Sequence, residues 1–203
     1  MEIEEIYKEL KLKYGKPAGQ WSFWCKRPKT FQEKERVIIE SILTQRANWK
    51  NVQLTVDKLS NTGKLSLKEI LNCKQSELEL LIKSSVFFRI KAERLKIVAD
   101  YILNKCGGIK KIKAIDTDSL RQQLLSLKGV GDETADSILL YAFERAVFVI
   151  DEYTKRLVKE KNLTNNLSYG NLQQLFETSL NNKDYILYQD FHALIVINGK
   201  TTK

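Results

Sequence analysis

A short segment with two closely spaced glycines, Leu127–Gly131, has the residue types needed to bind an anion through its backbone. Gly129 and Gly131 permit a tight turn with positive φ and a close approach of the backbone to a ligand. Such a turn leaves N–H groups uncovered at the start of the next helix, where a phosphate binds without a side chain. Val130, between the glycines, is expected to pack into the core. Taken alone, the pattern is more typical of a helix–helix turn that uses glycine for its own geometry.

An aspartate follows this turn at a distance of about 20 residues. Asp151 comes after the apolar run Phe148–Ile150 and directly before a segment with helical spacing, Glu152–Val158. Aspartate is a good N-cap in that position, because its carboxylate accepts hydrogen bonds from first-turn N–H groups. A carboxylate can also stabilise a developing positive charge or activate a water molecule. The two roles are compatible, and Asp151 is the candidate catalytic residue.

The composition indicates a basic protein with reduced cysteines. The 203 residues include 34 Lys and Arg against 25 Asp and Glu, a net charge of +9. A positive surface attracts polyanions such as nucleic acid. From charge alone, however, a lysine-rich surface that only keeps the protein soluble is an equally good explanation. Cys25, Cys73 and Cys106 are odd in number and widely spaced, which favours buried thiols over a zinc site or disulfides. No apolar run approaches the ~20 residues of a membrane span. We therefore expect a cytoplasmic protein without a membrane partner.

Apolar spacing predicts an all-α fold with two lobes. Proline is confined to Pro17 and Pro28, so nothing after residue 28 interrupts long helices. The run Ala146–Ile150 is rich in β-formers but too short to build a sheet. We expect one lobe from residues 1–34 and 131–203, and a central lobe from residues 35–130 that ends in the hairpin at 127–131. Helices are expected near residues 37–45, 92–102, 120–127, 135–143, 153–158 and 186–195.

Several segments, in consistent order, resemble the endonuclease III superfamily of helix-hairpin-helix DNA glycosylases. Leu127–Ala135 is similar to the LPGVGxxTA hairpin of that family, and Phe148–Tyr153 to the VDT/VDK segment that carries its catalytic aspartate. The family's LxxQ helix end, GxYxxKA wedge loop and C-terminal helix are similar to Ser41–Gln45, Phe87–Ala92 and Phe191–Ile195, with Val86 where glycine is usual. The resemblance covers residues 30–198 and implies a base-excision DNA glycosylase with a cleft for DNA and base between its lobes.

Two departures from the family pattern narrow the chemistry that the resemblance implies. Bifunctional members have a lysine two positions after the hairpin that attacks the sugar and then cuts the strand. Here that position is Glu133, which cannot form a Schiff base. Many members also end in four cysteines that bind an iron–sulfur cluster, whereas no cysteine follows Cys106. We therefore expect a monofunctional enzyme with no AP lyase activity and no iron–sulfur cluster. Whether a monovalent cation binds at the hairpin is left open by the sequence.

Both departures occur together in the 3-methyladenine DNA glycosylase III type branch, which Lys128–Ala142 and Phe191-His192 resemble most closely. The resemblance implies an aromatic base pocket, in which electron-rich rings select a cationic alkylated purine by cation–π contact. Core packing explains each candidate ring equally well. The candidates are Trp24, Trp49 and Trp21, followed less clearly by Tyr153 and Tyr188.

The branch places a modified lysine after its Phe-His pair, but the corresponding position here is Leu194, so that feature does not carry over. His192 is the only histidine, and we expect it to pack or hydrogen-bond internally rather than to take part in catalysis.

Release of a base from a duplex requires that the base be flipped out, at a cost of a few kcal/mol. The resemblance implies that Gln45 and Phe87 fill the gap, although for Phe87 a core position beside Phe88 is equally good. Asp151 would then face the sugar and stabilise its oxocarbenium-like transition state. Phosphate contacts are expected from the hairpin residues Lys128, Gly129, Val130 and Gly131, and from Lys91, Arg46 and Arg94.

Three alternatives stay open. The first is a bifunctional, endonuclease III-like glycosylase and lyase for oxidised bases that uses another amine, such as Lys155. The second is a non-catalytic helix-hairpin-helix DNA-binding protein, and the third is an all-α protein–protein adaptor. For the favoured interpretation, the expected partner is double-stranded DNA that contains a damaged base, bound by a monomer.

Overall fold

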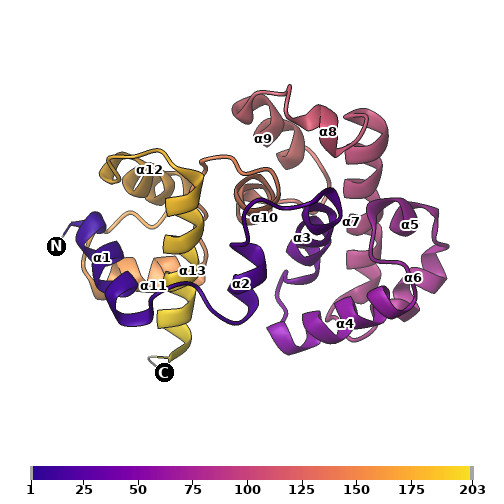
Figure 1. Cartoon of the computed structure of the whole chain (residues 1–203), viewed down its shortest axis with the longest axis horizontal. Coiled ribbons are helices and arrows are strands. Elements are labelled where there is room, and N and C mark those ends of the chain that lie inside the picture. The colour runs from indigo at the N-terminus through magenta and orange to yellow at the C-terminus, as the bar shows by residue number, and fades with distance from the viewer. Residues whose placement is uncertain (1, 202–203) are drawn as a thin grey trace. The chain divides into compact units, whose positions relative to one another are not determined.

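The computed structural model describes residues 2–201, and every regular element in that range is a helix, as Figure 1 shows. This confirms the all-α prediction. The chain divides into two compact units. Met1–Pro28 and Leu139–Lys203 form one, called here the terminal unit, and Lys29–Ile138 form the other, the central unit.

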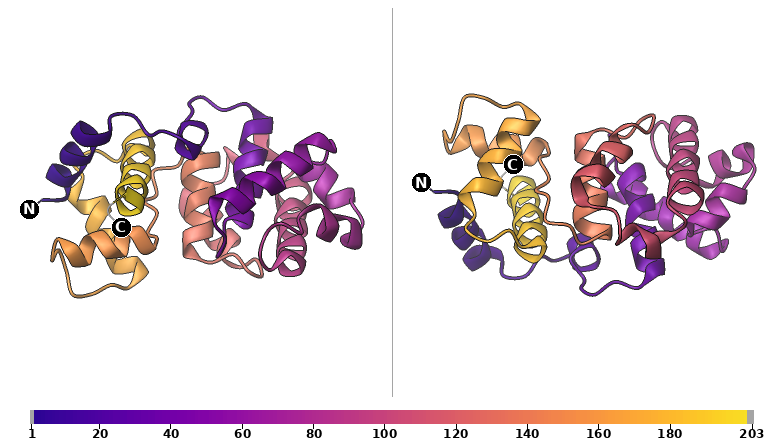
Figure 2. Two further views of the ribbon diagram at one scale, coloured as in Figure 1. Left: turned by 90° about the horizontal axis from the view of Figure 1, so that it is seen from below. Right: turned by 90° about the horizontal axis from the view of Figure 1, so that it is seen from above.

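The terminal unit is built around its last helix. Helix α13 packs against α1 and α11, and α1 lies beside α13 in both views of Figure 2. Phe148 and Phe176 stack with ring centroids 4.5 Å apart, and Phe191 of α13 lies 5.6–5.7 Å from both rings. Residues 191–196 of α13 are all buried, so this helix forms the core instead of covering it. The helices are α1 (Ile3–Tyr14), α2 (Gln20–Trp24), the π-helical turn η2 (Ile138–Ala142), α11 (Glu152–Glu160), α12 (Tyr169–Ser179) and α13 (Tyr185–Thr201).

The central unit is organised around α7, which packs against α3, α5 and α6. Helix α3 begins at a capping box, in which the N–H of Glu33 donates to Thr30 Oγ1 and the N–H of Thr30 donates to Glu33 Oε2. Its residues 37–43 are all buried. The helices are α3 (Phe31–Leu43), α4 (Trp49–Asn61), α5 (Leu67–Asn72), α6 (Gln75–Leu81), α7 (Phe88–Asp100), the π-helical turn η1 (Tyr101–Lys105), α8 (Ile109–Ile112), α9 (Thr117–Leu125) and α10 (Asp132–Ser137).

The unit boundaries differ from those expected at residues 34 and 130. The structure places them after Pro28 and Ile138, so that α10 belongs to the central unit. Helix α10 packs on α9 and α3. Arg121 of α9 strengthens this packing through ion pairs with Asp132 and with the buried Asp136, at 2.8 and 2.7 Å. The sequence pattern missed this because the hairpin glycines resemble a boundary, whereas side-chain pairing joins the two helices that flank them.

The run Ala146–Ile150 has no regular secondary structure and leads into the helix that starts after Asp151. Cys25 and Cys73 are buried and Cys106 is partly buried, all as free thiols. None of the helices between residues 2 and 201 has the length and apolar character needed to cross a membrane.

Candidate functional site

Asp151 lies at the start of α11 in the terminal unit, where it caps the helix. Its Oδ1 accepts hydrogen bonds from the backbone N–H of Thr154 at 2.8 Å and from the Thr154 hydroxyl at 3.0 Å. Thr154 is fully buried, and only 14% of the Asp151 side chain is exposed. The expected N-cap role is therefore present, and it uses one carboxylate oxygen and leaves the other for a different contact.

The second carboxylate oxygen faces a histidine from α13. His192 Nε2 lies 3.5 Å from Asp151 Oδ2, and 4% of His192 is exposed. The other ring nitrogen, Nδ1, is 2.8 Å from the hydroxyl of Tyr141 in η2, which is itself 3.2 Å from the backbone carbonyl of Gln189. His192 thus has the internal hydrogen bond that was expected of it, and it also faces the candidate catalytic group.

The surroundings of Asp151 favour its ionised form. Burial alone would raise the pKa of this carboxyl, but the proximity of His192 and the two hydrogen bonds from Thr154 outweigh it and hold the pKa below its ordinary value. Lys200, near the end of α13, adds a positive charge in the same region. Burial lowers the pKa of Lys200, and the Asp151 carboxylate counteracts that effect. Asp151 is consequently a carboxylate, not a carboxylic acid, at neutral pH.

An aromatic cluster adjoins this pair. The rings of Trp21 and Trp24 in α2 meet edge to face with centroids 5.6 Å apart. Trp21 lies 5.5 Å from His192, and Trp24 lies 5.1 Å from Tyr141, both again edge to face. Trp21 and Trp24 are only 6% and 5% exposed. Two of the three predicted pocket tryptophans therefore lie in the same unit as Asp151 and next to its histidine neighbour, but they are packed together in the core.

A polar clamp holds α2 and the following turn against α13. The guanidinium of Arg27 donates to Asp190 Oδ1 at 3.0 Å and to the carbonyl of Ile186 at 3.2 Å. The Cys25 thiol donates to the carbonyl of Gln189 at 3.6 Å. These contacts position the tryptophans relative to α13, which also carries His192.

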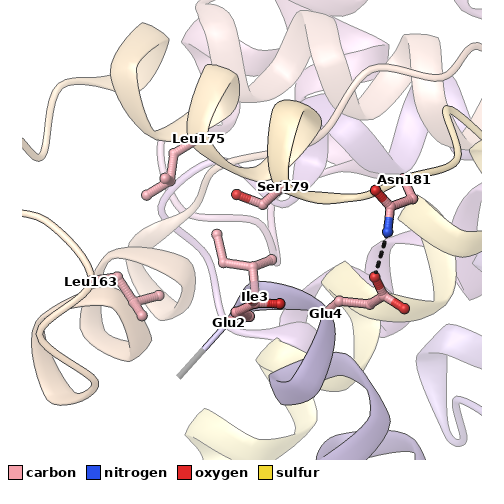
Figure 3. A pocket seen from close by; sticks show the side chains of 7 residues that line it. All are labelled: Glu2, Ile3, Glu4, Leu163, Leu175, Ser179 and Asn181. Carbon is pink, nitrogen blue, oxygen red and sulfur yellow. Dashed lines mark hydrogen bonds between the residues drawn. The ribbon is translucent and has the colours of Figure 1, made fainter.

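The terminal unit also contains a hollow of about 350 Å³, which lies away from Asp151. Its lining comes from the start of α1, from the end of α12 and from Leu163. Figure 3 shows Asn181 donating to Glu4 across it, at 2.9 Å. No aromatic ring lines this hollow, so it is not the predicted base pocket.

The predicted hairpin is present in the central unit between α9 and α10. The N–H of Val130 donates to the carbonyl of Leu127 at 3.0 Å, and Gly129 has φ +86°, which L side chains rarely adopt. Gly131 caps α10, whose first-turn N–H groups have no partner within their own helix. Val130 is 5% exposed and packs inward, as expected. The positive φ that was inferred for the turn is thus present at Gly129, whereas Gly131 has an extended backbone with φ −99°.

Gln45 is tied to the hairpin by its side chain. Its Nε2 donates to the carbonyl of Gly129 at 3.1 Å and to Thr134 Oγ1 at 3.0 Å. Its Oε1 accepts a short hydrogen bond from Arg94 Nη1. A Cβ added to Gly129 would come within 2.1 Å of Arg94 Nε, so the guanidinium lies directly over the hairpin backbone. Gln45 and Arg94 therefore support the hairpin from within the protein.

The loop before α7 presents apolar side chains to solvent. Phe87 has φ +58° and is 54% exposed, and its neighbours Val86 and Ile90 are 44% and 48% exposed. A bulky residue in the left-handed region is uncommon and marks a position worth a functional explanation. Of the two alternatives for Phe87, the structure has the exposed loop position and not a core position.

Lys91 is not a surface phosphate contact as was expected, because it is 1% exposed. Its Nζ donates to the carbonyl of Leu43, the last residue of α3, at 2.7 Å and to Ser85 Oγ at 2.8 Å. Burial lowers the pKa of this ammonium to about 8. Lys91 connects the end of α3, two residues before Gln45, to the loop that carries Phe87. The motif gave no sign of this, because lysine is usually exposed.

The other predicted residues lie at or near the surface of the central unit. Lys128 pairs with Glu93 at 2.8 Å and its side chain is 77% exposed. Arg46 is exposed and has φ +50°. Glu133 is exposed in the first turn of α10. Trp49 is partly buried at the start of α4, and thus belongs to a different unit from Trp21 and Trp24.

Tyr141 was not singled out from the sequence, and the proximity of His192 to Asp151 was not foreseen. Tyr141, Asp151 and His192 come from three separate elements. A single histidine in an apolar helix gives no sign of its partner. Only the packing of α13 on α11 brings it to the carboxylate.

Comparison with known proteins identifies relatives over nearly the full length of the chain. Residues 39–182 match the sequence profile of the HhH-GPD superfamily of base excision DNA repair proteins. A protein of Methanocaldococcus jannaschii, provisionally named a DNA repair glycosylase, is 38% identical over 201 residues, which cover 98% of this chain and 87% of that one.

Solved structures share the arrangement of helices. The H. pylori 3-methyladenine DNA glycosylase bound to 1,N6-ethenoadenine has a TM-score of 0.82 at 28% identity, covering 100% of this chain and 99% of that one. A trapped covalent complex of endonuclease III with DNA has a TM-score of 0.72 at 16% identity, covering 96% and 83% of the two chains. The second match is a likeness of fold alone.

Proposed function

This chain belongs to the HhH-GPD superfamily of base excision DNA repair proteins, and we propose that it is a monofunctional DNA glycosylase that releases an alkylated purine, such as 3-methyladenine, from duplex DNA. The observation that carries the proposal is Asp151, a buried carboxylate kept ionised at the start of α11 and next to a cluster of aromatic rings.

Asp151 has the properties that cleavage of a glycosidic bond requires. As the bond breaks, the sugar becomes an oxocarbenium-like cation, and a fixed negative charge stabilises that transition state more than the ground state. Thr154 fixes Oδ1 through two hydrogen bonds, so the carboxylate does not need to reorient during the reaction. The lowered pKa keeps the charge in place. Asp151 can also orient or deprotonate the attacking water.

Glu133 supports a reaction that stops after base release. Strand cleavage by the superfamily's lyase route needs an amine that forms a Schiff base with the sugar, and a carboxylate cannot do this. Lys155, the alternative amine, donates to Glu152 Oε1 at 2.9 Å and is held in that ion pair. We therefore propose no AP lyase activity, and a cofactor-free enzyme in which no iron–sulfur cluster is formed.

An alkylated purine is the proposed substrate because of its charge. A purine alkylated on a ring nitrogen is cationic and departs readily, so the protein needs selectivity more than an acid. Trp21 and Trp24 place electron-rich rings beside the His192–Asp151 pair. The likeness to the H. pylori 3-methyladenine DNA glycosylase supports this class of base.

For DNA engagement we propose that the hairpin binds a backbone phosphate and that Phe87 is the wedge. An exposed aromatic ring at a loop tip is suited to insertion between bases. Gln45 would contribute from the opposite side only after giving up its bonds to Gly129, Thr134 and Arg94. Lys128 and Arg46 are exposed and supply positive charge near the hairpin and near Gln45.

The test is release of bases from uniformly methylated duplex DNA, with the products identified by mass. We expect the wild-type protein to release 3-methyladenine. The Asp151→Asn variant should release it at least about 100-fold more slowly, which is the effect typical of removing one group that stabilises charge in the transition state. Asparagine remains a good N-cap, so the variant should fold normally. Asp118→Asn, which removes an exposed charge on α9, is the matched control. Unchanged release by Asp151→Asn would refute the proposed role.

The alternative of a glycosylase and lyase is tested on abasic DNA with borohydride. A trapped covalent adduct of the wild-type protein would support the bifunctional alternative, and its absence supports the proposal. If wild type binds DNA but releases no base from methylated, deaminated or oxidised substrates, the protein is a binding module.

A further inference from the structure

The imidazole of His192 has one ring nitrogen in a defined hydrogen bond and the other directed at Asp151. Nδ1 is 2.8 Å from the Tyr141 hydroxyl, and Nε2 is 3.5 Å from Asp151 Oδ2. Nε2 is buried and, among the residues that the structure describes, has no other hydrogen-bond partner. Its separation from Oδ2 exceeds a normal hydrogen bond but lies within ion-pair distance.

The position of the hydrogens follows from the partners of Tyr141. Its hydroxyl has one hydrogen and two neighbours, the carbonyl of Gln189 at 3.2 Å and Nδ1 of His192. If the hydroxyl donates to Nδ1, the neutral imidazole must carry its own hydrogen on Nε2. If it donates to Gln189, Nδ1 must donate to the hydroxyl oxygen. A bare Nε2 lone pair would then face the buried carboxylate and be repelled, so Nε2 carries a hydrogen as well and the ring is an imidazolium paired with Asp151. Both arrangements place a hydrogen on Nε2, facing Oδ2.

We propose that His192 is a positioning residue for Asp151, whose Nε2–H holds and stabilises the carboxylate through Oδ2, and that Tyr141 fixes the tautomer in which it can do so. The inference rests on the proposed role of Asp151. Together, Thr154 on Oδ1 and His192 on Oδ2 fix the rotation of the carboxylate. Their donor hydrogens also place positive partial charge next to both carboxylate oxygens, in place of the water that burial removes.

The charged groups around the pair are few and can be named. Lys200 of α13 is close enough to Asp151 for their charges to interact. Glu152 and Lys155 flank Asp151 on α11 and pair with each other. On the other side of the imidazole, the Tyr141 hydroxyl interacts electrostatically with Cys25, Asp190 and Arg27. Arg27 and Asp190 are themselves paired at 3.0 Å. None of these groups contacts Asp151 Oδ2, so removal of His192 leaves that oxygen without its donor.

The first test is the pH dependence of single-turnover base release by His192→Phe and Tyr141→Phe. Loss of the donor should raise the pKa of Asp151, so we expect the acid limb of the His192→Phe profile to move up by about one pH unit or more. Affinity for undamaged DNA should stay unchanged. Tyr141→Phe should move the acid limb less, and His192→Gln, which keeps an N–H donor, should partly restore it. A uniform loss of rate at every pH, or an unshifted acid limb, would overturn the proposal.

The second test needs no variant, because the chain contains one histidine. The ¹⁵N resonances of its imidazole in the intact protein report which nitrogen carries hydrogen. We expect a protonated Nε2 at neutral pH, and a deprotonated Nε2 would overturn the proposal even if the variants failed to fold. The outcomes are separable from the function itself: a wild-type protein that releases no base rejects the proposed function, whereas the imidazole resonances report on His192 alone.

Discussion

Lys91 shows how one buried charge can join two functional segments. Its ammonium holds the end of α3 and Ser85, and its backbone N–H donates to the carbonyl of Phe87 at 3.0 Å. An ammonium that is almost fully buried without a carboxylate partner is expensive, which agrees with a pKa lowered to about 8. This cost arises where Lys91 joins the end of α3 to the loop that carries Phe87.

The lowered pKa of Lys91 predicts a pH dependence of stability. Between about pH 8 and pH 10.5 the unfolded chain binds a proton at this lysine that the folded chain does not bind. The free energy of unfolding should therefore rise with pH across this window, by on the order of 1 kcal/mol per unit. Lys91→Met should lose that rise in urea titrations at pH 8 to 10. The control is Lys68→Met, an exposed position that also removes one charge. Parallel slopes for wild type and Lys91→Met would contradict the prediction.

Between helices, the contacts of the central unit join the hairpin to α3 and α7. Arg94 of α7 lies over Gly129 and binds Gln45, and Gln45 binds the carbonyl of Gly129. These three elements are separate in the sequence, yet each supplies one part of the proposed DNA-binding surface. The hairpin is thus held in shape by side chains and not only by its own glycines.

Gly129→Ala should disturb this arrangement. The substitution places a Cβ at φ +86° and 2.1 Å from Arg94 Nε, so both the backbone and the guanidinium must shift. We expect a loss of roughly 1–3 kcal/mol in stability and weaker binding of duplex DNA. Urea unfolding and fluorescence anisotropy measure the two effects. Gly170→Ala in α12 is the matched control, since its Cβ would meet nothing within 4 Å. Equal behaviour of the two variants would argue against the proposed role of the hairpin.

Across the whole chain, the net charge of +9 and the exposed lysines set how binding depends on salt. The affinity for undamaged duplex should fall linearly with salt on logarithmic axes, with a slope of about −0.9 for each phosphate contact. Lys128→Ala should make this slope shallower by about one, because Lys128 is exposed beside the hairpin. Asp151→Asn should leave the slope unchanged. Affinity that does not respond to salt would favour the adaptor alternative.

Local features of the molecule were predictable from the sequence. Features that depend on residues close together in the chain include the helical spacing, the hairpin at Leu127–Gly131 and the N-cap at Asp151. The presence of Glu133, where bifunctional relatives have lysine, is equally local. Local backbone preference and first-turn hydrogen bonding determine such features, and the order of the motifs was enough to indicate the family.

The tertiary structure alone decided which side chains meet. His192 reaches Asp151 because α13 packs on α11, and Gln45 reaches Gly129 because α10 packs on α3. The burial of Lys91 and the position of α10 in the central unit were misjudged for the same reason. Contacts between distant segments depend on how whole helices fill space together, and the spacing of residues within one helix does not encode which neighbour it will meet.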